Sequence, residues 1–164
     1  MKLITWNIQW GCGMDGRVDL ERIVTTARGL ADFDVLCLQE VADGFDDLPG
    51  SRGEDQFAEI AGRVPGYVAV AGVAVDVAGG PRGRRRFGNM ILSRLPIARV
   101  LRHILPWEAD SETRNMPRGL LEVEIDGPFG PLRVMTTHLE YFSARLRSAQ
   151  VAAIRDVCRR NSAR

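Results

Sequence analysis

The chain has 164 residues, of which 45% are hydrophobic, so it has the length of one ordinary domain and enough apolar side chains for a core. Its 22 basic and 21 acidic residues almost balance, which excludes a protein that coats nucleic acid through its overall charge. We expect a single domain over residues 1–164 that binds any anion through a few local side chains.

The cysteines and the apolar runs indicate the compartment. Cys12, Cys37 and Cys158 are scattered and form neither a disulfide framework nor a C-x-x-C metal site. The first ten residues are too polar for the apolar region of a signal peptide, and no stretch approaches the ~20 apolar residues of a membrane span. We therefore expect a cytoplasmic protein without a transmembrane segment.

The first half of the chain alternates predicted strands with predicted helices. Apolar periodicity favours strands at 2–8, 34–41 and 67–78, and helices at 19–33 and 54–64. Asp19 is a suitable N-cap for the first helix, and Pro65 with Gly66 ends the second. Residues 43–53 and the glycine- and arginine-rich segment 79–86 are expected to be loops.

The second half of the chain favours antiparallel strands. Strands are expected at 87–97, 119–126 and 132–140, and a helix at 143–160 with Ser143 as its N-cap. A Gly- and Pro-rich turn at 127–131 joins two of these strands as a hairpin. The pattern predicts an α/β (α+β) fold with mixed, largely antiparallel sheets.

A glycine motif follows the first strand. In "ITWNIQWGCGMDGR", Gly11, Gly13 and Gly16 spell the G-x-G-x-x-G of dinucleotide-binding proteins, and Glu40 ends the next apolar run. A dinucleotide loop requires the helix to begin within the motif, whereas here it begins later, and Asp15 would place a carboxylate against the phosphates. We therefore expect a flexible turn and no NAD.

Three polar residues stand at the ends of predicted strands. Asn7 and Glu40 each follow an apolar run, and their oxygens are hard ligands of the kind that suits Mg²⁺. His138 also follows an apolar strand, where it can bond a phosphoryl oxygen or move a proton. The alternative is local: Asn7 caps a turn, Glu40 is a solvated strand end and His138 is structural.

Two other polar features have simpler interpretations. His103 follows Arg102 without such a strand end and is expected to be structural. The arginines of the loop at 79–86 either reach a polyanion, such as DNA or a phosphoinositide headgroup, or form a solvated loop.

Five segments taken together resemble the endonuclease/exonuclease/phosphatase superfamily of metal-dependent phosphoesterases, which includes DNase I. In chain order they are "TWNIQW", "LCLQEV", "FGNMILSRLPI", "MPRGLLEVEI" and "VMTTHLE". The resemblance implies a DNase I-like four-layer α/β sandwich, in which two mixed sheets lie face to face with helices outside. It also implies hydrolysis of phosphodiester or phosphomonoester bonds with Mg²⁺, or Mn²⁺ in its place.

The resemblance assigns roles to the matching residues. Asn7 matches an asparagine near the metal and the scissile phosphate, Glu40 the glutamate that binds the metal, and His138 the histidine that contacts the phosphate. Arg118, in "PRG", is expected to meet a substrate phosphate. Asn89 belongs to a matching segment and is a further candidate at the phosphate, with a structural role as the alternative.

The sequence departs from the family after its last helix. The D-x-N motif and the Asp–His pair that supplies the family's general base are missing, so the chain resembles the N-terminal two-thirds of the domain. We expect such a portion to build mainly one sheet and to leave an apolar face for a second copy, another chain or a further segment.

Two functions remain open at this point. One is a phosphoesterase whose base lies outside this chain. The other is a non-catalytic phosphate- or metal-binding fragment that another chain complements. The substrate also stays open among nucleic acid, a phospholipid headgroup and a small phosphate ester.

Overall fold

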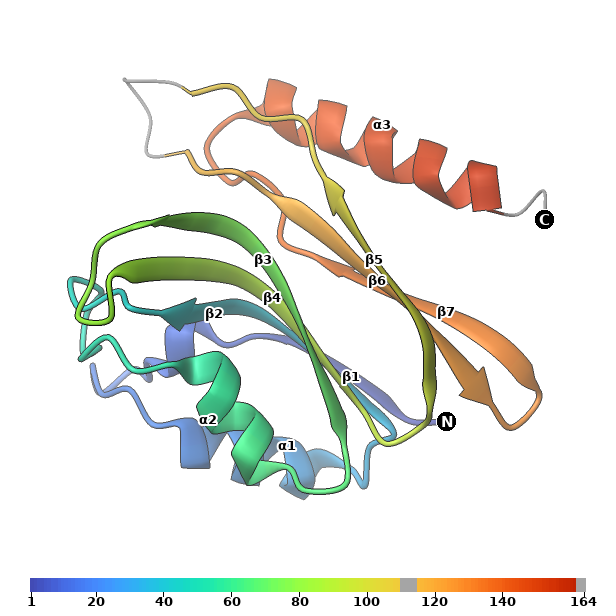
Figure 1. The fold of residues 1–164 in the computed structure, drawn as a ribbon, viewed down its shortest axis with the longest axis horizontal. Coiled ribbons are helices and arrows are strands. Elements are labelled where there is room, and N and C mark those ends of the chain that lie inside the picture. The colour runs from blue at the N-terminus through green and yellow to red at the C-terminus, as the bar shows by residue number, and fades with distance from the viewer. Residues whose placement is uncertain (110–114, 162–164) are drawn as a thin grey trace.

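The computed structural model describes residues 1–109 and 115–161, which form two β-sheets flanked by helices (Figure 1). The strands are β1 (Leu3–Asn7), β2 (Val35–Asp43), β3 (Val68–Ala78), β4 (Arg84–Ser93), β5 (Ile97–Ile104), β6 (Gly119–Gly127) and β7 (Gly130–Thr137). The helices are η1 (Gln9–Gly11), α1 (Leu20–Leu30), α2 (Gln56–Arg63) and α3 (Ala144–Asn161). Within these ranges, no helix has the length and apolarity needed to cross a membrane.

The first sheet has the strand order β1-β2-β4-β3, and α1 and α2 cover its outer face (Figure 1). β1 and β2 are parallel, whereas β2, β4 and β3 pair antiparallel. The predicted N-cap is confirmed, because the Asp19 carboxylate accepts a hydrogen bond from the backbone nitrogen of Arg22 at 2.9 Å. Val24 of α1 and Ile60 of α2 pack with Leu38 of β2 in the core beneath the helices.

The second sheet, β5-β6-β7, packs against the free face of the first. Cys37 and Ile91 of the first sheet meet Leu121 and Val123 of β6 in one apolar cluster. At Gly72 the sheets approach closely, since a Cβ atom there would lie 2.8 Å from Leu121 Cβ. The expectation of mainly one sheet with an exposed apolar face is therefore wrong: the chain covers that face itself.

Helix α3 covers the outer face of the second sheet (Figure 1). Val157 of α3 packs with Leu120 of β6 and Leu105, and the Ser143 hydroxyl accepts from the backbone nitrogen of Leu146 at 3.3 Å as the predicted cap. The order helices, sheet, sheet, helix gives four layers. The expected DNase I-like α/β sandwich is confirmed.

One strand was missed and one local expectation is wrong in part. Strand β5 was not expected, because Arg99, Arg102 and His103 interrupt its apolar pattern and Pro96 ends the preceding strand. The segment expected as a loop at 79–86 contributes its last three residues to β4. That strand extends because its arginines are paired with carboxylates, as described below.

Candidate metal and phosphate site

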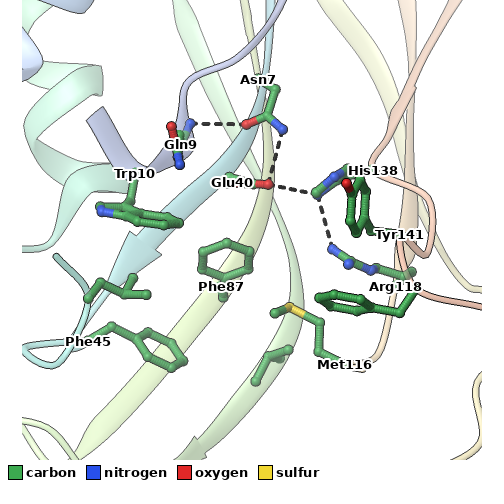
Figure 2. A pocket seen from close by; sticks show the side chains of 13 residues that line it. Asn7, Gln9, Trp10, Glu40, Phe45, Phe87, Met116, Arg118, His138 and Tyr141 are labelled. Carbon is green, nitrogen blue, oxygen red and sulfur yellow. Dashed lines mark hydrogen bonds and ion pairs between the residues drawn. The ribbon is translucent and has the colours of Figure 1, made fainter. Parts of the chain in front are cut away.

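Four side chains from the two sheets lie close together, three of them at strand ends and Glu40 at an irregularity within a strand (Figure 2). Asn7 ends β1, Glu40 lies in β2, Arg118 immediately precedes β6, and His138 immediately follows β7. Glu40 Oε1 lies 3.0 Å from Asn7 Nδ2 and 3.4 Å from His138 Nδ1, and His138 Nδ1 lies 3.0 Å from an Arg118 guanidinium nitrogen. The four residues, drawn from strands far apart in the chain, form one continuous polar cluster.

The backbone is strained around this cluster. Glu40 has φ +60°, at a register shift in β2 that lies between Leu38 and Val41. Gln9 and Trp10 have φ values of +47° and +44°, and in the described ranges no other non-glycine residue has positive φ. Bulges and positive φ values redirect side chains at a cost in stability, so the irregular backbone here directs the Glu40 side chain toward Asn7 and His138.

Asn7 positions Glu40 through its amide. Its Oδ1 accepts a hydrogen bond from the backbone nitrogen of Gln9 at 3.0 Å, and its Nδ2 donates to Glu40 Oε1 at 3.0 Å. The amide nitrogen, and not the oxygen, therefore faces the carboxylate. In this arrangement the Asn7 amide orients the Glu40 carboxylate.

The charges around His138 favour its neutral form. Burial, and after it the neighbouring Arg118 guanidinium, lower the pKa of His138 below the ordinary histidine value, while Glu40 and Glu140 act against them. A neutral ring accepts the Arg118 N–H at Nδ1 and carries its proton on Nε2. That proton is a hydrogen-bond donor for a ligand.

Glu140 is a member of the site that the sequence did not single out. The residue is 1% exposed, and its Oε2 lies 3.7 Å from Nε of Arg118, which is 7% exposed. In the described part of the chain, these two buried atoms have no hydrogen-bond partner. Oε1 is occupied, because the backbone nitrogen of Phe142 donates to it at 2.8 Å. The signal was an acidic residue two positions after His138.

Gln39 is a second residue that the sequence did not single out. Its Nε2 donates to Thr136 Oγ1 at 2.7 Å and to Thr5 Oγ1 at 3.1 Å, so it joins β2 to β1 and to β7 of the other sheet. This bridge lies directly beside Glu40 in the sequence. A polar residue at the end of an apolar strand was the available signal.

Asn89 lies beside the cluster rather than in it. Its side chain is 3% exposed, and its Nδ2 donates to the carbonyl oxygen of Gly119 at 3.0 Å. The hydrogen bond ties β4 to the residue that follows Arg118. Asn89 therefore positions the start of β6.

The four arginines of the segment 79–86 are paired with aspartates. Asp43, with a side chain 3% exposed, binds both Arg82 and Arg86. The remaining pairs are Arg84 with Asp76, Arg85 with Asp46 and Asp47, and Arg86 with Asp55. Residues 79–83 form an exposed turn, as the loop interpretation predicted, and the charge of the four arginines is neutralised locally rather than left open to a polyanion.

The other two sequence features lie outside the cluster. His103 Nε2 contacts Glu122 Oε2 at 2.8 Å on the second sheet. Helix α1 begins beyond Gly16, and the Arg22 guanidinium, bound to Asp15 at 2.9 Å, lowers the pKa of that carboxyl. The glycine motif thus forms a turn whose carboxylate is already paired.

The cluster opens into a cavity of about 680 Å³, which is the size of a small-molecule site. Asn7, Glu40, Arg118 and His138 all line it, beside a group of aromatic side chains (Figure 2). Among the described residues, no three His, Cys, Asp or Glu side chains gather around one point. Both contacts of Glu40 found in that part of the chain use Oε1, which leaves Oε2 for a cation. One carboxylate with waters and phosphate suits Mg²⁺.

Comparison with solved structures gives the same fold. A protein described as an endonuclease/exonuclease/phosphatase from Beutenbergia cavernae matches with 30% identity and a TM-score of 0.74, over 94% of this chain and 43% of that one. The catalytic domain of human Nocturnin, solved with a bound sulfate anion, matches with 18% identity and a TM-score of 0.64, over 98% and 58%. D. rerio TDP2, complexed with a single-strand DNA product, matches with 18% identity and a TM-score of 0.60, over 93% and 52%.

The chain spans about half the length of these three proteins. No significant match is found among curated protein sequences. The model of the Endonuclease/Exonuclease/phosphatase family matches residues 4–161, almost the entire sequence. The chain therefore belongs to the Endonuclease/Exonuclease/phosphatase family.

Proposed function

We propose that this chain binds a phosphate ester together with a divalent metal ion, Mg²⁺ or Mn²⁺, and that the site serves phosphoester hydrolysis. The observation that carries the proposal is the convergence of Asn7, Glu40, Arg118 and His138 in one cavity. A carboxylate that is partly free, a buried guanidinium and a neutral imidazole are complementary to a metal-bound phosphate.

Each residue has a distinct task in this proposal. Glu40 would hold the metal, with Asn7 fixing its carboxylate through Oε1. When bound, the metal supplies Lewis-acid polarisation of the phosphoryl oxygens. Arg118 places positive charge beside the phosphate, and His138 donates from Nε2 to an oxygen whose negative charge grows during the reaction.

The similar structures support a phosphate-type ligand. Nocturnin is described with a sulfate anion, and TDP2 with a single-strand DNA product. Sulfate and phosphate share their tetrahedral oxygens and negative charge, which charge-assisted donors such as Arg118 recognise.

A second candidate is binding without hydrolysis by this chain. An in-line attack needs a general base for the water, and no aspartate–histidine pair lines the cavity within the described ranges. In that case the 164 residues supply the metal and phosphate half of a site, and the base comes from elsewhere.

Two measurements with Mg²⁺ separate the candidates. Titration calorimetry with methyl phosphate reads binding, and release of nitrophenol from bis-p-nitrophenyl phosphate reads hydrolysis, each with and without EDTA. Glu40→Gln removes the metal ligand at constant shape, and Glu21→Gln, at a carboxylate 68% exposed on α1, is the matched control.

Metal-dependent binding and hydrolysis, both lost in Glu40→Gln, support the hydrolase. Metal-dependent binding without hydrolysis supports the second candidate. If methyl phosphate binds equally well with EDTA, or equally well to Glu40→Gln, the proposed metal site is wrong.

A further inference from the structure

Beyond the polar cluster of Asn7, Glu40, Arg118 and His138, the cavity is lined mainly by aromatic rings. Trp10, Phe45, Phe87 and Tyr141 surround its interior, with Met116 beside them (Figure 2). The rings come from four segments: η1, the segment that follows β2, strand β4 and the segment that follows β7. The same hollow therefore joins a place for phosphate to a place for a flat apolar group.

These rings are held in fixed positions. The indole nitrogen of Trp10 donates to the carbonyl oxygen of Pro49 at 3.0 Å. The ring of Phe45 meets that of Phe87 edge to face, with centroids 6.0 Å apart. The Arg85 guanidinium also contacts Phe45 and lies 4.8 Å from its ring centroid. A ligand ring thus meets preorganised partners, which reduces the entropy lost on binding.

A fifth ring, Phe142, lines the cavity beside Tyr141 at its exposed side. Tyr141 and Phe142 pack edge to face with centroids 5.2 Å apart, although they are 75% and 57% exposed. The backbone nitrogen of Phe142 donates to Glu140 Oε1, so this aromatic pair is anchored to the ion pair of Glu140 with Arg118. Exposed aromatic side chains next to a polar site are typical of ligand contacts.

The charges favour a ligand with one phosphate. In the described part of the chain, the cavity is lined by a single guanidinium, that of Arg118, beside the imidazole of His138. The arginines at 82–86 are paired with aspartates and are not available to a run of phosphates. A long polyanion would find few cations here, whereas one phosphate joined to an apolar group fits both parts of the cavity.

We propose that the aromatic part of this cavity binds a flat ring of the phosphate ester, so that the ligands of this site are aryl or nucleoside phosphates rather than alkyl phosphates. The inference rests on the proposed function, because it takes the phosphate to lie at Glu40, Arg118 and His138. Aromatic side chains stack on any flat π-system, and an alkyl chain of equal size gains only apolar burial.

The test compares matched ligands on the whole chain in the presence of Mg²⁺. Methyl phosphate measures the phosphate contribution alone, and phenyl and hexyl phosphate add six carbons as a ring or as a chain. Adenosine 5′-monophosphate carries its ring farther from the phosphate and distinguishes a nucleobase from an aryl group. Phenyl phosphate is expected to bind about fivefold or more tightly than hexyl phosphate, the factor typical of a favourable ring pair.

Phe45→Leu removes a ring while keeping an apolar side chain. It is expected to abolish the preference for phenyl over hexyl phosphate and to leave the affinity for methyl phosphate unchanged. Phe129→Leu is the matched control, because Phe129 is fully exposed in the turn between β6 and β7 and does not line the cavity. If adenosine 5′-monophosphate binds more tightly than phenyl phosphate, the ring is a nucleobase, and the reverse order indicates an aryl ester.

The outcomes separate this inference from the proposed function. If hexyl phosphate binds as tightly as phenyl phosphate, or if Phe45→Leu keeps the preference, the ring site is wrong, while metal-dependent binding of methyl phosphate still supports the proposed function. If methyl phosphate does not bind with Mg²⁺, the proposed function fails, and the ring site fails with it.

Discussion

Two clusters in this molecule combine arginines with carboxylates, and they differ in how completely those charges are satisfied. Around Asp43, the arginines at 82–86 bind five aspartates, all of which except the buried Asp43 are at least partly exposed. Around Arg118, one buried guanidinium faces Glu140, and both groups keep a buried atom without a hydrogen bond in the described part of the chain. The first cluster has many charges and is saturated. The second has few charges, and two of its buried polar atoms make no hydrogen bond within the described residues.

This difference separates a structural cluster from a candidate site. Buried polar atoms are normally satisfied, because an unmade hydrogen bond there costs about 1–3 kcal/mol. Two such atoms, Arg118 Nε and Glu140 Oε2, face each other at 3.7 Å near the strained Glu40, so this buried pair is held by charge without a hydrogen bond. Arginine content alone therefore points to the wrong region of this sequence.

The largest effect on stability is expected from Arg118→Met. The variant leaves the Glu140 carboxylate buried without its cation, which typically costs about 3–5 kcal/mol. Urea unfolding of the variant measures this loss. In the double variant Arg118→Met/Glu140→Gln the uncompensated charge is gone, so more than half of the lost stability is expected to return. A loss below about 1 kcal/mol, the level of a surface pair, would show that the two clusters do not differ in this way.

A smaller loss is expected from Asp43→Asn at the centre of the saturated cluster. Its side chain is 3% exposed and binds Arg82 and Arg86, so the neutral amide loses charge-assisted hydrogen bonds worth about 1.5–3 kcal/mol. The arginines themselves are half-exposed and return to water. Urea unfolding reads the loss, and calorimetry is expected to show unchanged affinity for methyl phosphate with Mg²⁺. A parallel loss of that affinity would place Asp43 in the binding site.

A loss of about 1–3 kcal/mol is expected from Gln39→Leu, because it leaves the buried Thr136 hydroxyl without its partner between the sheets. Adding Thr136→Val removes both polar groups, and most of the stability is expected to return. Thermal unfolding of the single and double variants measures both steps. If the double variant is less stable than the single one, the Gln39–Thr136 bond is not what joins the sheets here.

The smallest effect is expected from Arg84→Met. Its guanidinium, 56% exposed, pairs with an aspartate 48% exposed, and such pairs contribute at most about 1 kcal/mol. The same substitution that disrupts the buried cluster at Arg118 should therefore be nearly silent here, both in urea unfolding and in phosphate binding. Weaker binding of methyl phosphate in Arg84→Met would mean that the saturated cluster also serves the ligand.

The sequence predicted the parts of the fold that local patterns determine. Apolar periodicity and the caps Asp19 and Ser143 placed the helices, and the turn at 127–131 placed the hairpin of β6 and β7. Strand β5 escaped detection because its polar side chains pair across strands, as Arg99 does with Glu124 at 2.6 Å. The packing of the second sheet on the first depends on long-range contacts that no local window contains.

The candidate site, like the fold, was predictable from the sequence only in part. Asn7 and His138 were predictable as polar residues at strand ends. Glu40 was predicted in the same way, although β2 continues past it to Asp43, and the structure brings the three together. The left-handed backbone of Glu40, the buried partner Glu140 and the bridge from Gln39 were not predictable, because each depends on residues far apart in the chain. The sequence also did not show that the arginines of the segment 79–86 are neutralised, because their five aspartate partners come from other parts of the chain.

The most direct test of the metal and phosphate site is a crystal of this chain grown with Mn²⁺ and methyl phosphate, because anomalous scattering locates the metal. We expect the manganese peak at about 2.0–2.2 Å from a carboxylate oxygen of Glu40, the usual range for such ions, with the phosphate between the metal and the Arg118 and His138 side chains. A peak at the surface aspartates around the arginine segment, with no metal at Glu40, would contradict the account.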